Sequence, residues 1–182
     1  MLNAIGGVEL SSIAKGFEAL DAMLKASRVK LLLSRSICPG KYLVLISGEV
    51  GDVNAAVESG SSVIEHCLVD SFVIPSIDPQ VIPAIENVVT VAEPGAFGSL
   101  ETFSVSAVIE AADAAVKAAD VKLMEIRLAM AIGGKGFFTI TGSVAGVETA
   151  INAAAMVASR KGLLVEKTVI ANPKKELFSD NI

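Results

Sequence analysis

Hydrophobic and polar positions along the first half of the chain follow the order strand, helix, strand, strand, helix, strand. Phe17, Leu20 and Leu24 recur at the spacing of one helical face, while charged residues occupy another face, as a period near 3.6 residues requires. Runs rich in Val, Ile and Leu, separated by Gly or Pro-Gly, predict the strands. The expected elements are strand 4–10, helix 12–27, strands 29–34 and 42–47, helix 53–66 and strand 68–74.

The second half repeats the first. The run that begins at Glu18 returns from Glu110, at an offset of about 92 residues, and two copies are too few for a solenoid, which needs roughly three. We therefore predict two domains, 1–90 and 91–182, each with the βαββαβ order of ferredoxin-like α/β (α+β) folds. The expected elements of the second copy are strand 100–105, helix 106–119, strands 121–129 and 136–141, helix 147–160 and strand 163–170. A short helix is expected around 83–86 in the Pro- and Gly-rich segment between the copies.

Composition narrows the classes of function. Hydrophobic residues make up 52% and charged residues 19% of the chain, against usual values of about 45–50% and 25%. Two small domains this apolar are expected to bury surface against each other and against neighbouring chains. The net charge of −5 and the absence of Trp argue against a nucleic-acid partner. The longest uncharged stretch, 136–147, is too short to span a membrane, and two cysteines form no disulfide framework, which favours a cytosolic protein.

The two copies differ most at the loop between their central strands. The first copy has Ser36-Ile37-Cys38-Pro39-Gly40, and the second has Ala131-Ile132-Gly133-Gly134. Cys38 precedes a strong turn signal, so we expect it to be exposed, where packing does not explain a cysteine. Iron–sulfur centres usually need about four thiolates, so one thiol could contribute only if three or more chains met at an axis. From the residues alone, an unliganded loop cysteine remains the alternative.

Other candidates for chemistry are weaker. Cys67, beside an apolar strand, is expected to be a small buried hydrophobe, and His66 a solvated residue near a helix end. The run Gly133–Gly136 lacks the Walker pattern, although a turn that faces a small anion stays open. We expect the helical carboxylates to be solvated, with no catalytic role, and the chain not to be an enzyme. These carboxylates are Glu18, Asp21, Glu110 and Asp113.

Two motifs resemble a known family. Asp21–Ala26 and Asp113–Ala118 are similar to the Asp-Ala-x-x-Lys-Ala helix of bacterial microcompartment shell proteins, and Gly48–Val53 resembles the Gly-Asp-Val turn of that family. Within the family, 36–41 and 131–135 look most like the trimeric iron–sulfur shell proteins of propanediol-utilisation compartments. The resemblance covers nearly the whole chain, in both halves.

The resemblance implies a homotrimer of tandem domains that imitates a hexameric shell tile in a microcompartment. It implies that Cys38 of each chain ligates one [4Fe-4S] cluster shared by three chains, for electron transfer across the shell or for cluster delivery. Lys25 and Lys117 would meet other shell proteins at the tile edge, and encapsulated redox enzymes would be further partners. The loops between the central strands would line a pore. Its lining residues would be Ser36, Ile37, Pro39, Gly40, Ile132, Gly133 and Gly134.

Two alternatives remain beside this interpretation. One is a tile without a cluster, whose pore conducts a small metabolite. The other is a soluble ligand-binding regulator built from two ferredoxin-like domains. The ends of the copies also depart from the Pro-Arg-Pro-His ending common in the family, which removes its edge arginine; Lys161 and Lys174 are candidate substitutes.

Overall fold

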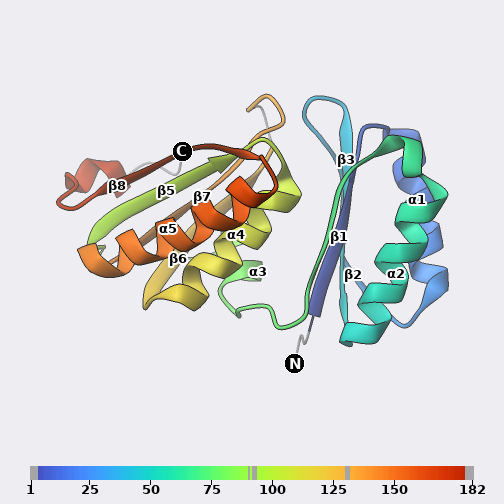
Figure 1. Cartoon of the computed structure of the whole chain (residues 1–182), viewed down its shortest axis with the longest axis horizontal. Coiled ribbons are helices and arrows are strands. Elements are labelled where there is room, and N and C mark those ends of the chain that lie inside the picture. The colour runs from blue at the N-terminus through green and yellow to red at the C-terminus, as the bar shows by residue number, and fades with distance from the viewer. Residues whose placement is uncertain (1–3, 90, 92–93, 130–131, 179–182) are drawn as a thin grey trace. The chain divides into compact units, whose positions relative to one another are not determined.

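The chain folds into two compact units, each built around one sheet (Figure 1). The computed structural model describes residues 4–89, 91, 94–129 and 132–178. Unit 1 comprises Met1–Ile77 together with Ser104–Ser106 and Ala129–Gly134. Unit 2 comprises Asp78–Phe103, Ala107–Leu128 and Lys135–Ile182. Unit 1 therefore includes two short segments of the second copy, Ser104–Ser106 and Ala129–Gly134.

Unit 1 contains an antiparallel sheet in the order β2-β3-β1-β4, with its helices on one side (Figure 1). Val8, Leu10, Val44 and Ile46 are fully buried on the helix side and form the core with Met23. Antiparallel pairing with helices segregated to one face is an α+β architecture. The elements are β1 (Ala4–Leu10), α1 (Ile13–Ala26), β2 (Lys30–Ile37), β3 (Lys41–Gly48), α2 (Val50–Val63), the 3₁₀ turn η1 (Glu65–Cys67) and β4 (Leu68–Ile74).

Two glycines let α1 approach its neighbours closely. A Cβ atom on Gly16 of α1 would lie 2.3 Å from the ring of Tyr42, and a Cβ atom on Gly60 of α2 would lie 2.5 Å from Met23 Cγ. The helix begins at Ile13 because the Ser12 hydroxyl accepts a hydrogen bond from the Lys15 backbone N–H at 3.3 Å. The position of α1 on the sheet thus depends on small residues at its buried face.

Unit 2 repeats the plan, with the sheet order β6-β7-β5-β8. The helix α5 packs along β5 and β8, and the Ser143 hydroxyl caps its first turn by accepting from Gly146 N–H at 3.1 Å. The short helix α3 lies against β6. The elements are α3 (Val81–Ile85), β5 (Ala96–Thr102), α4 (Val105–Ala118), β6 (Val121–Leu128), β7 (Gly136–Gly142), α5 (Val144–Arg160), β8 (Leu164–Ile170) and the 3₁₀ turn η2 (Lys175–Phe178).

The structure confirms the predicted fold class and element order, and it corrects several boundaries. Strands β1 and β4 have the predicted bounds. The prediction for β5 was wrong by four residues at its start, because Ala96–Gly98 pair with β7 and Val105 opens a helix rather than ending a strand. Helices α2 and α5 begin three residues earlier than predicted. Strand β2 runs on to Ile37, so the turn that follows contains only three residues.

Candidate functional site

Cys38 lies in the turn that joins the two neighbouring strands β2 and β3. Ile37 and Lys41 are paired across the strands, which leaves Cys38, Pro39 and Gly40 as the turn itself. Gly40 has a φ of +79° with open space around it, so glycine serves here for its backbone conformation. The Cys38 thiol is free and partly exposed, as the sequence predicted for a turn cysteine.

The loop of the second copy that contains Gly134 contacts this turn within unit 1. The Cys38 backbone N–H donates to the Ala129 carbonyl oxygen at 2.9 Å. Gly134, with a φ of +83°, sits so close that a Cβ atom on it would lie 2.6 Å from Pro39 Cδ and 3.1 Å from the Cys38 carbonyl oxygen. Glycine is therefore required at position 134, because the backbone has a positive φ and because a side chain would collide with Pro39. The structure brings Cys38, Pro39 and Gly134 together.

The remaining residues predicted to line a pore differ in exposure. Ser36, Pro39, Gly40 and Gly133 are exposed, and Ile132 is partly exposed. Ile37 and Gly134 are buried within the chain. Ala131, which belongs to the same predicted loop, lies outside the described residues.

No complete metal site is formed by one chain within its described residues. Among them, no three His, Cys, Asp or Glu side chains come together in a way that could hold a metal ion. The turn offers one sulfur donor, and a thiolate is the ligand that iron–sulfur clusters use. Cys38 therefore fits such a cluster only as one of several ligands contributed by different chains.

A buried carboxylate is paired with the residue that follows this turn, and the sequence analysis did not identify it. Glu9 on β1 is fully buried and accepts from the ammonium of Lys41, the residue that follows the turn, at 2.8 Å. Its other oxygen accepts from the Ser104 hydroxyl at 2.8 Å and from the Ser106 backbone N–H at 3.2 Å. These bonds satisfy a charge that would otherwise be costly to bury. Ser104 also donates to Asp70 at 3.2 Å.

The second copy has the same pair in a more exposed form. Lys135 donates to Glu101 at 2.9 Å, and the two side chains are 39% and 33% exposed. The recurrence of a Glu in the first strand and a Lys after the loop, in both copies, is the sequence signal that could have identified these pairs.

The two lysines predicted at a tile edge differ in their surroundings. Lys25 pairs with Asp21 at 2.6 Å, with both side chains well exposed. Lys117 pairs with Asp113 at 2.5 Å, but Asp113 is buried and also accepts from the Asp78 backbone N–H at 2.8 Å. The prediction that Asp113 is solvated was therefore wrong, because these bonds hold it against the segment before α3.

Three other candidates have ordinary roles. Cys67 is partly exposed rather than buried as predicted, because it lies in the turn η1, and its carbonyl oxygen accepts from Ser11 N–H at 2.8 Å. His66 is exposed in the same turn, as predicted. Lys161 forms an ion pair with Glu110 inside unit 2, so Glu110 is not simply a solvated carboxylate, while Lys174 is exposed.

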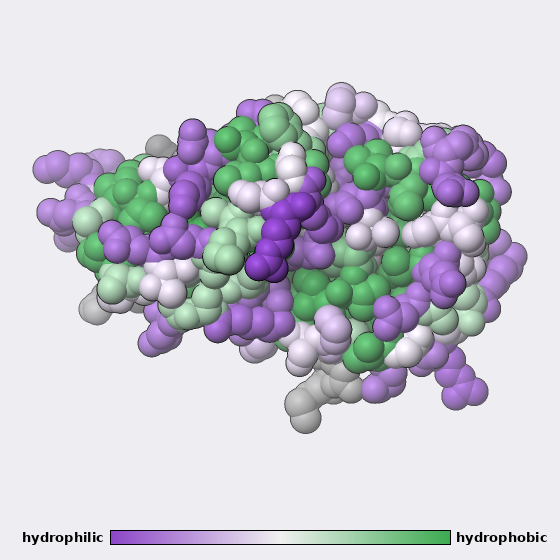
Figure 2. All heavy atoms as spheres, in the orientation of Figure 1, coloured by the Kyte–Doolittle hydropathy of each residue, from purple (hydrophilic) through white to green (hydrophobic). Residues whose placement is uncertain are grey.

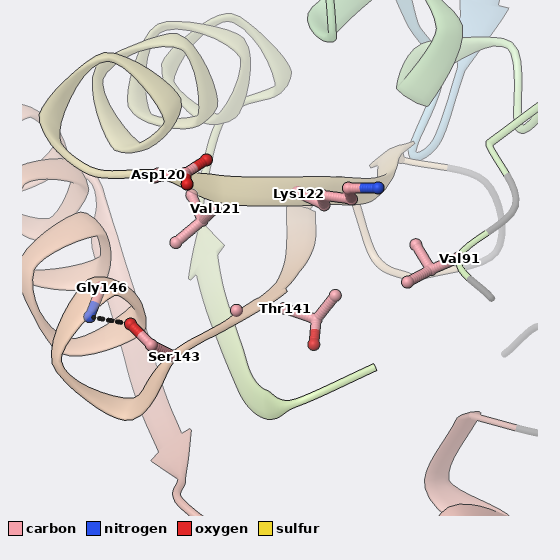
Figure 3. Close-up of a pocket in the computed structure, with 8 residues that line it drawn as sticks. Val91, Asp120, Val121, Lys122, Thr141, Ser143 and Gly146 are labelled. Carbon is pink, nitrogen blue, oxygen red and sulfur yellow. Dashed lines mark hydrogen bonds between the residues drawn. The ribbon is translucent and has the colours of Figure 1, made fainter. Parts of the chain in front are cut away.

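A pocket of about 340 Å³ lies in unit 2, beside the start of β6 and the first turn of α5 (Figure 3). Its lining includes Lys122, Thr141 and Ser143. The Thr141 hydroxyl accepts from Gly95 N–H and donates to the Ala96 carbonyl oxygen, both at 2.9 Å, and Ser143 caps α5. The hydroxyl groups here thus serve the fold. None of the residues predicted for the site lines this pocket.

In the part of the chain that the structure describes, no helix has the length and apolar character needed to cross a membrane.

Comparison with known proteins gives one family for both copies. Residues 4–77 and 96–173 each match the BMC domain. The chain is 47% identical over 178 residues to the bacterial microcompartment shell protein PduT of Citrobacter freundii, with 98% of this chain and 97% of that protein covered. It is 32% identical to the carboxysome assembly protein CcmO of Synechocystis, across 96% of this chain and 63% of that protein.

Solved structures agree with the sequence relatives. A microcompartment protein from Desulfitobacterium hafniense DCB has a TM-score of 0.88 and 46% identity, over 99% of this chain and 100% of that one. The fused permuted hexameric shell protein MSM0275, from the RMM microcompartment, has a TM-score of 0.65 at 24% identity, over 86% of this chain and 81% of that one, and supports the fold alone. The chain therefore belongs to the BMC domain family, as a structural shell protein of bacterial microcompartments with two domains in tandem.

Proposed function

We propose that three copies of this chain form one tile of the shell, with a central pore whose three Cys38 thiolates hold a [4Fe-4S] cluster. The observation that carries the proposal is the partly exposed, free thiol of Cys38 on a turn fixed by Ala129 and Gly134. A three-fold axis would bring together the three sulfur donors that a single chain lacks among its described residues. The fourth iron would then have no protein thiolate and could take another ligand.

The residues of the turn have distinct tasks in this proposal. Cys38 supplies the ligand atom, and the exposed Pro39 and Gly40 leave the turn accessible to the other chains. The Cys38 N–H is already bonded to Ala129, so the turn keeps its shape without the cluster. When bound, the cluster would supply one-electron transfer, either across the shell or to redox enzymes inside. Ser36, Ile132 and Gly133 would line the pore beside it.

The tile would meet other shell proteins through its edges. Lys25 carries a well exposed ammonium, and Lys117 is 43% exposed although its partner Asp113 is buried. Both ammonium groups reach the surface, so each could contact a neighbouring tile.

A tile without a cluster is the second candidate. It is favoured by the absence of a complete donor set within the described residues of one chain. In that case the pore would pass a small metabolite, and Cys38 would be an unliganded thiol on its rim.

Anaerobic purification followed by EPR, iron and sulfide analysis distinguishes the two candidates. For the wild type we expect about four iron atoms per three chains, and for Cys38→Ser loss of iron and of the EPR signal. The matched control is Cys67→Ser, which removes the other partly exposed thiol and should keep the iron. Unchanged iron in Cys38→Ser would contradict the cluster at this site. Absence of iron from the wild type after anaerobic reconstitution would favour the metabolite pore.

A further inference from the structure

The charge close to the Cys38 turn comes from two individual residues. Hydrophilic side chains lie in several places on the visible face of both units (Figure 2). The turn itself, 38–40, contains no Asp, Glu, Lys or Arg. The nearest charged residues along the chain are Arg35, three residues before Cys38, and Lys41, three residues after it. These two cations are therefore the first charges that a cluster on Cys38 would meet along the chain.

The side chain of Arg35 is on the face of the unit 1 sheet that lies away from the helices. Its neighbour Ser34 bonds the hydroxyl of Tyr42, a core residue of the helix side, at 2.9 Å. Successive residues of a strand point to opposite faces, so Arg35 points away from α1 and α2. At a rise of about 3.3 Å per residue, the Cα atoms of Arg35 and Cys38 are about 10 Å apart. A charge at about one Debye length is only partly screened by salt.

The two cations differ in their partners. Lys41 is paired with the fully buried carboxylate of Glu9, which compensates its charge. In the part of the chain that the structure describes, no carboxylate pairs with Arg35, and its Nε has no hydrogen-bond partner. Asp70, which is paired with Glu9 across the strands, lies on β4, three strands away from β2. The positive charge of Arg35 is thus not compensated nearby.

The corresponding arginine of the second copy has a carboxylate beside it. Arg127 is at the repeat offset of about 92 residues from Arg35, and its guanidinium donates to Glu125 at 3.1 Å. The same offset turns Glu125 into Leu33. The copy that carries the turn cysteine therefore lacks the carboxylate that would neutralise its arginine.

We propose that Arg35 raises the reduction potential of the cluster by stabilising its reduced form. This inference rests on the cluster proposed at Cys38. Reduction is the uptake of one electron from an external reductant, with no bond formed or broken, and it makes the cluster more negative. A nearby positive charge favours the more negative form, and net charge is one of the factors that set the potential of such clusters. Because three chains would share one cluster, three Arg35 side chains act on each electron.

Anaerobic redox titration with dithionite, followed by EPR, measures this effect on the full-length protein. Arg35→Gln removes the charge, and Leu33→Glu supplies the carboxylate that the second copy has. For both variants we expect the ratio of reduced to oxidised cluster at a fixed potential to fall at least about 10-fold, which is about 59 mV for one electron. Arg35→Lys keeps the charge and should stay within about 3-fold of the wild type, because at this distance the cation acts as a point charge.

The matched control is Lys30→Gln on the same strand. Lys30 is exposed at the start of β2, eight residues before Cys38, which is about 26 Å at the same rise per residue. This distance exceeds two Debye lengths, so the ratio should change by less than about 2-fold. Circular dichroism and iron analysis check that each variant is folded and contains the cluster.

The possible outcomes separate this inference from the proposed cluster. Unchanged potentials in Arg35→Gln and Leu33→Glu, with iron retained, would overturn the role of Arg35 and leave the cluster standing. An equal shift in Lys30→Gln would also overturn it, because overall charge would then explain the effect. Absence of iron from the wild type overturns the cluster and this inference together.

Loss of iron from a variant is also decisive. A lower potential in Leu33→Glu supports the proposal even where Arg35→Gln fails to hold iron. If both of these variants lose iron while Arg35→Lys keeps it, Arg35 serves to retain the cluster, and its role in setting the potential is overturned.

Discussion

The backbone N–H of Cys38 donates to the carbonyl oxygen of Ala129, at 2.9 Å. This bond joins the loop of the first copy to the loop of the second, the place where the two copies differ most in sequence. The loop without a cysteine therefore supports the loop that carries one.

Gly134→Ala should disturb the Cys38 turn more than Gly133→Ala. Both glycines have positive φ, so either alanine carries a conformational cost of about 1–2 kcal/mol. Only at Gly134 would the added methyl group also meet Pro39 Cδ, at 2.6 Å, whereas Gly133 has open space. We expect a further loss of about 1–3 kcal/mol for Gly134→Ala in urea unfolding, together with lower iron content. Equal losses for the two variants would argue that the contact with Pro39 is unimportant.

Glu9→Gln should destabilise the chain much more than Glu101→Gln. Glu9 is fully buried against Lys41, so the neutral variant leaves a poorly compensated charge and should cost about 3 kcal/mol. Glu101 and Lys135 are each about a third exposed, and the same change there should cost below about 1 kcal/mol. Urea unfolding of the two variants and the wild type measures these costs. Similar costs would show that burial of Glu9 does not strengthen its ion pair.

Gly16→Ala should lower stability although alanine favours helices. The new Cβ atom would meet the Tyr42 ring at 2.3 Å, and overpacking of this kind costs about 1–3 kcal/mol. The control is Gly51→Ala in α2, where the Cβ atom has open space and the better helix former should stabilise by about 0.5–1 kcal/mol. Thermal unfolding followed by circular dichroism measures both. A stabilised Gly16→Ala variant would mean that α1 can move away from the sheet at little cost.

Lys25→Ala combined with Lys117→Ala should abolish lateral assembly but not folding. Loss of the exposed Lys25 pair should cost below about 1 kcal/mol, and loss of Lys117 from the buried Asp113, which keeps its bond from Asp78 N–H, should cost about 1–3 kcal/mol. Negative-stain electron microscopy should show sheets for the wild type and separate tiles for the variant. Lys167→Ala removes another exposed lysine, bonded to Asn152 at 2.6 Å, and should still form sheets. Sheets formed by the double variant would exclude these lysines from the tile edge.

Much of the fold could be predicted because the same pattern occurs twice. Strands β1 and β4 were predicted with their observed bounds, and each helix except α3 was supported by its counterpart in the other copy. The start of β5 was missed because Gly98 weakens the strand pattern there, while pairing with Ile140 of β7 fixes it in the structure. Tertiary contacts thus decided the boundary where the local signal was weak.

The site was only partly predictable, for a physical reason. A turn cysteine before Pro-Gly can be located from sequence, since turn residues have strong local signals. The burial of Glu9 cannot, because a Glu within a strand usually faces water and its partners Lys41, Ser104 and Ser106 are all distant in sequence. The contact of Gly134 with Pro39 likewise joins segments about 95 residues apart, beyond the reach of any local pattern.

The fusion of two copies into one chain also fixes the composition of any ring built from it. If the two kinds of loop were carried by separate chains, six of them would assort at random, and rings with no thiols or with six would form alongside those with three. Covalent linkage instead makes one contact of each pair intramolecular, at a high effective concentration. Every closed ring of three such chains must then contain cysteine and glycine loops in strict alternation. Because the two loops are linked in one chain, their ratio and order in the ring are fixed, whereas in a mixture of subunits both would vary.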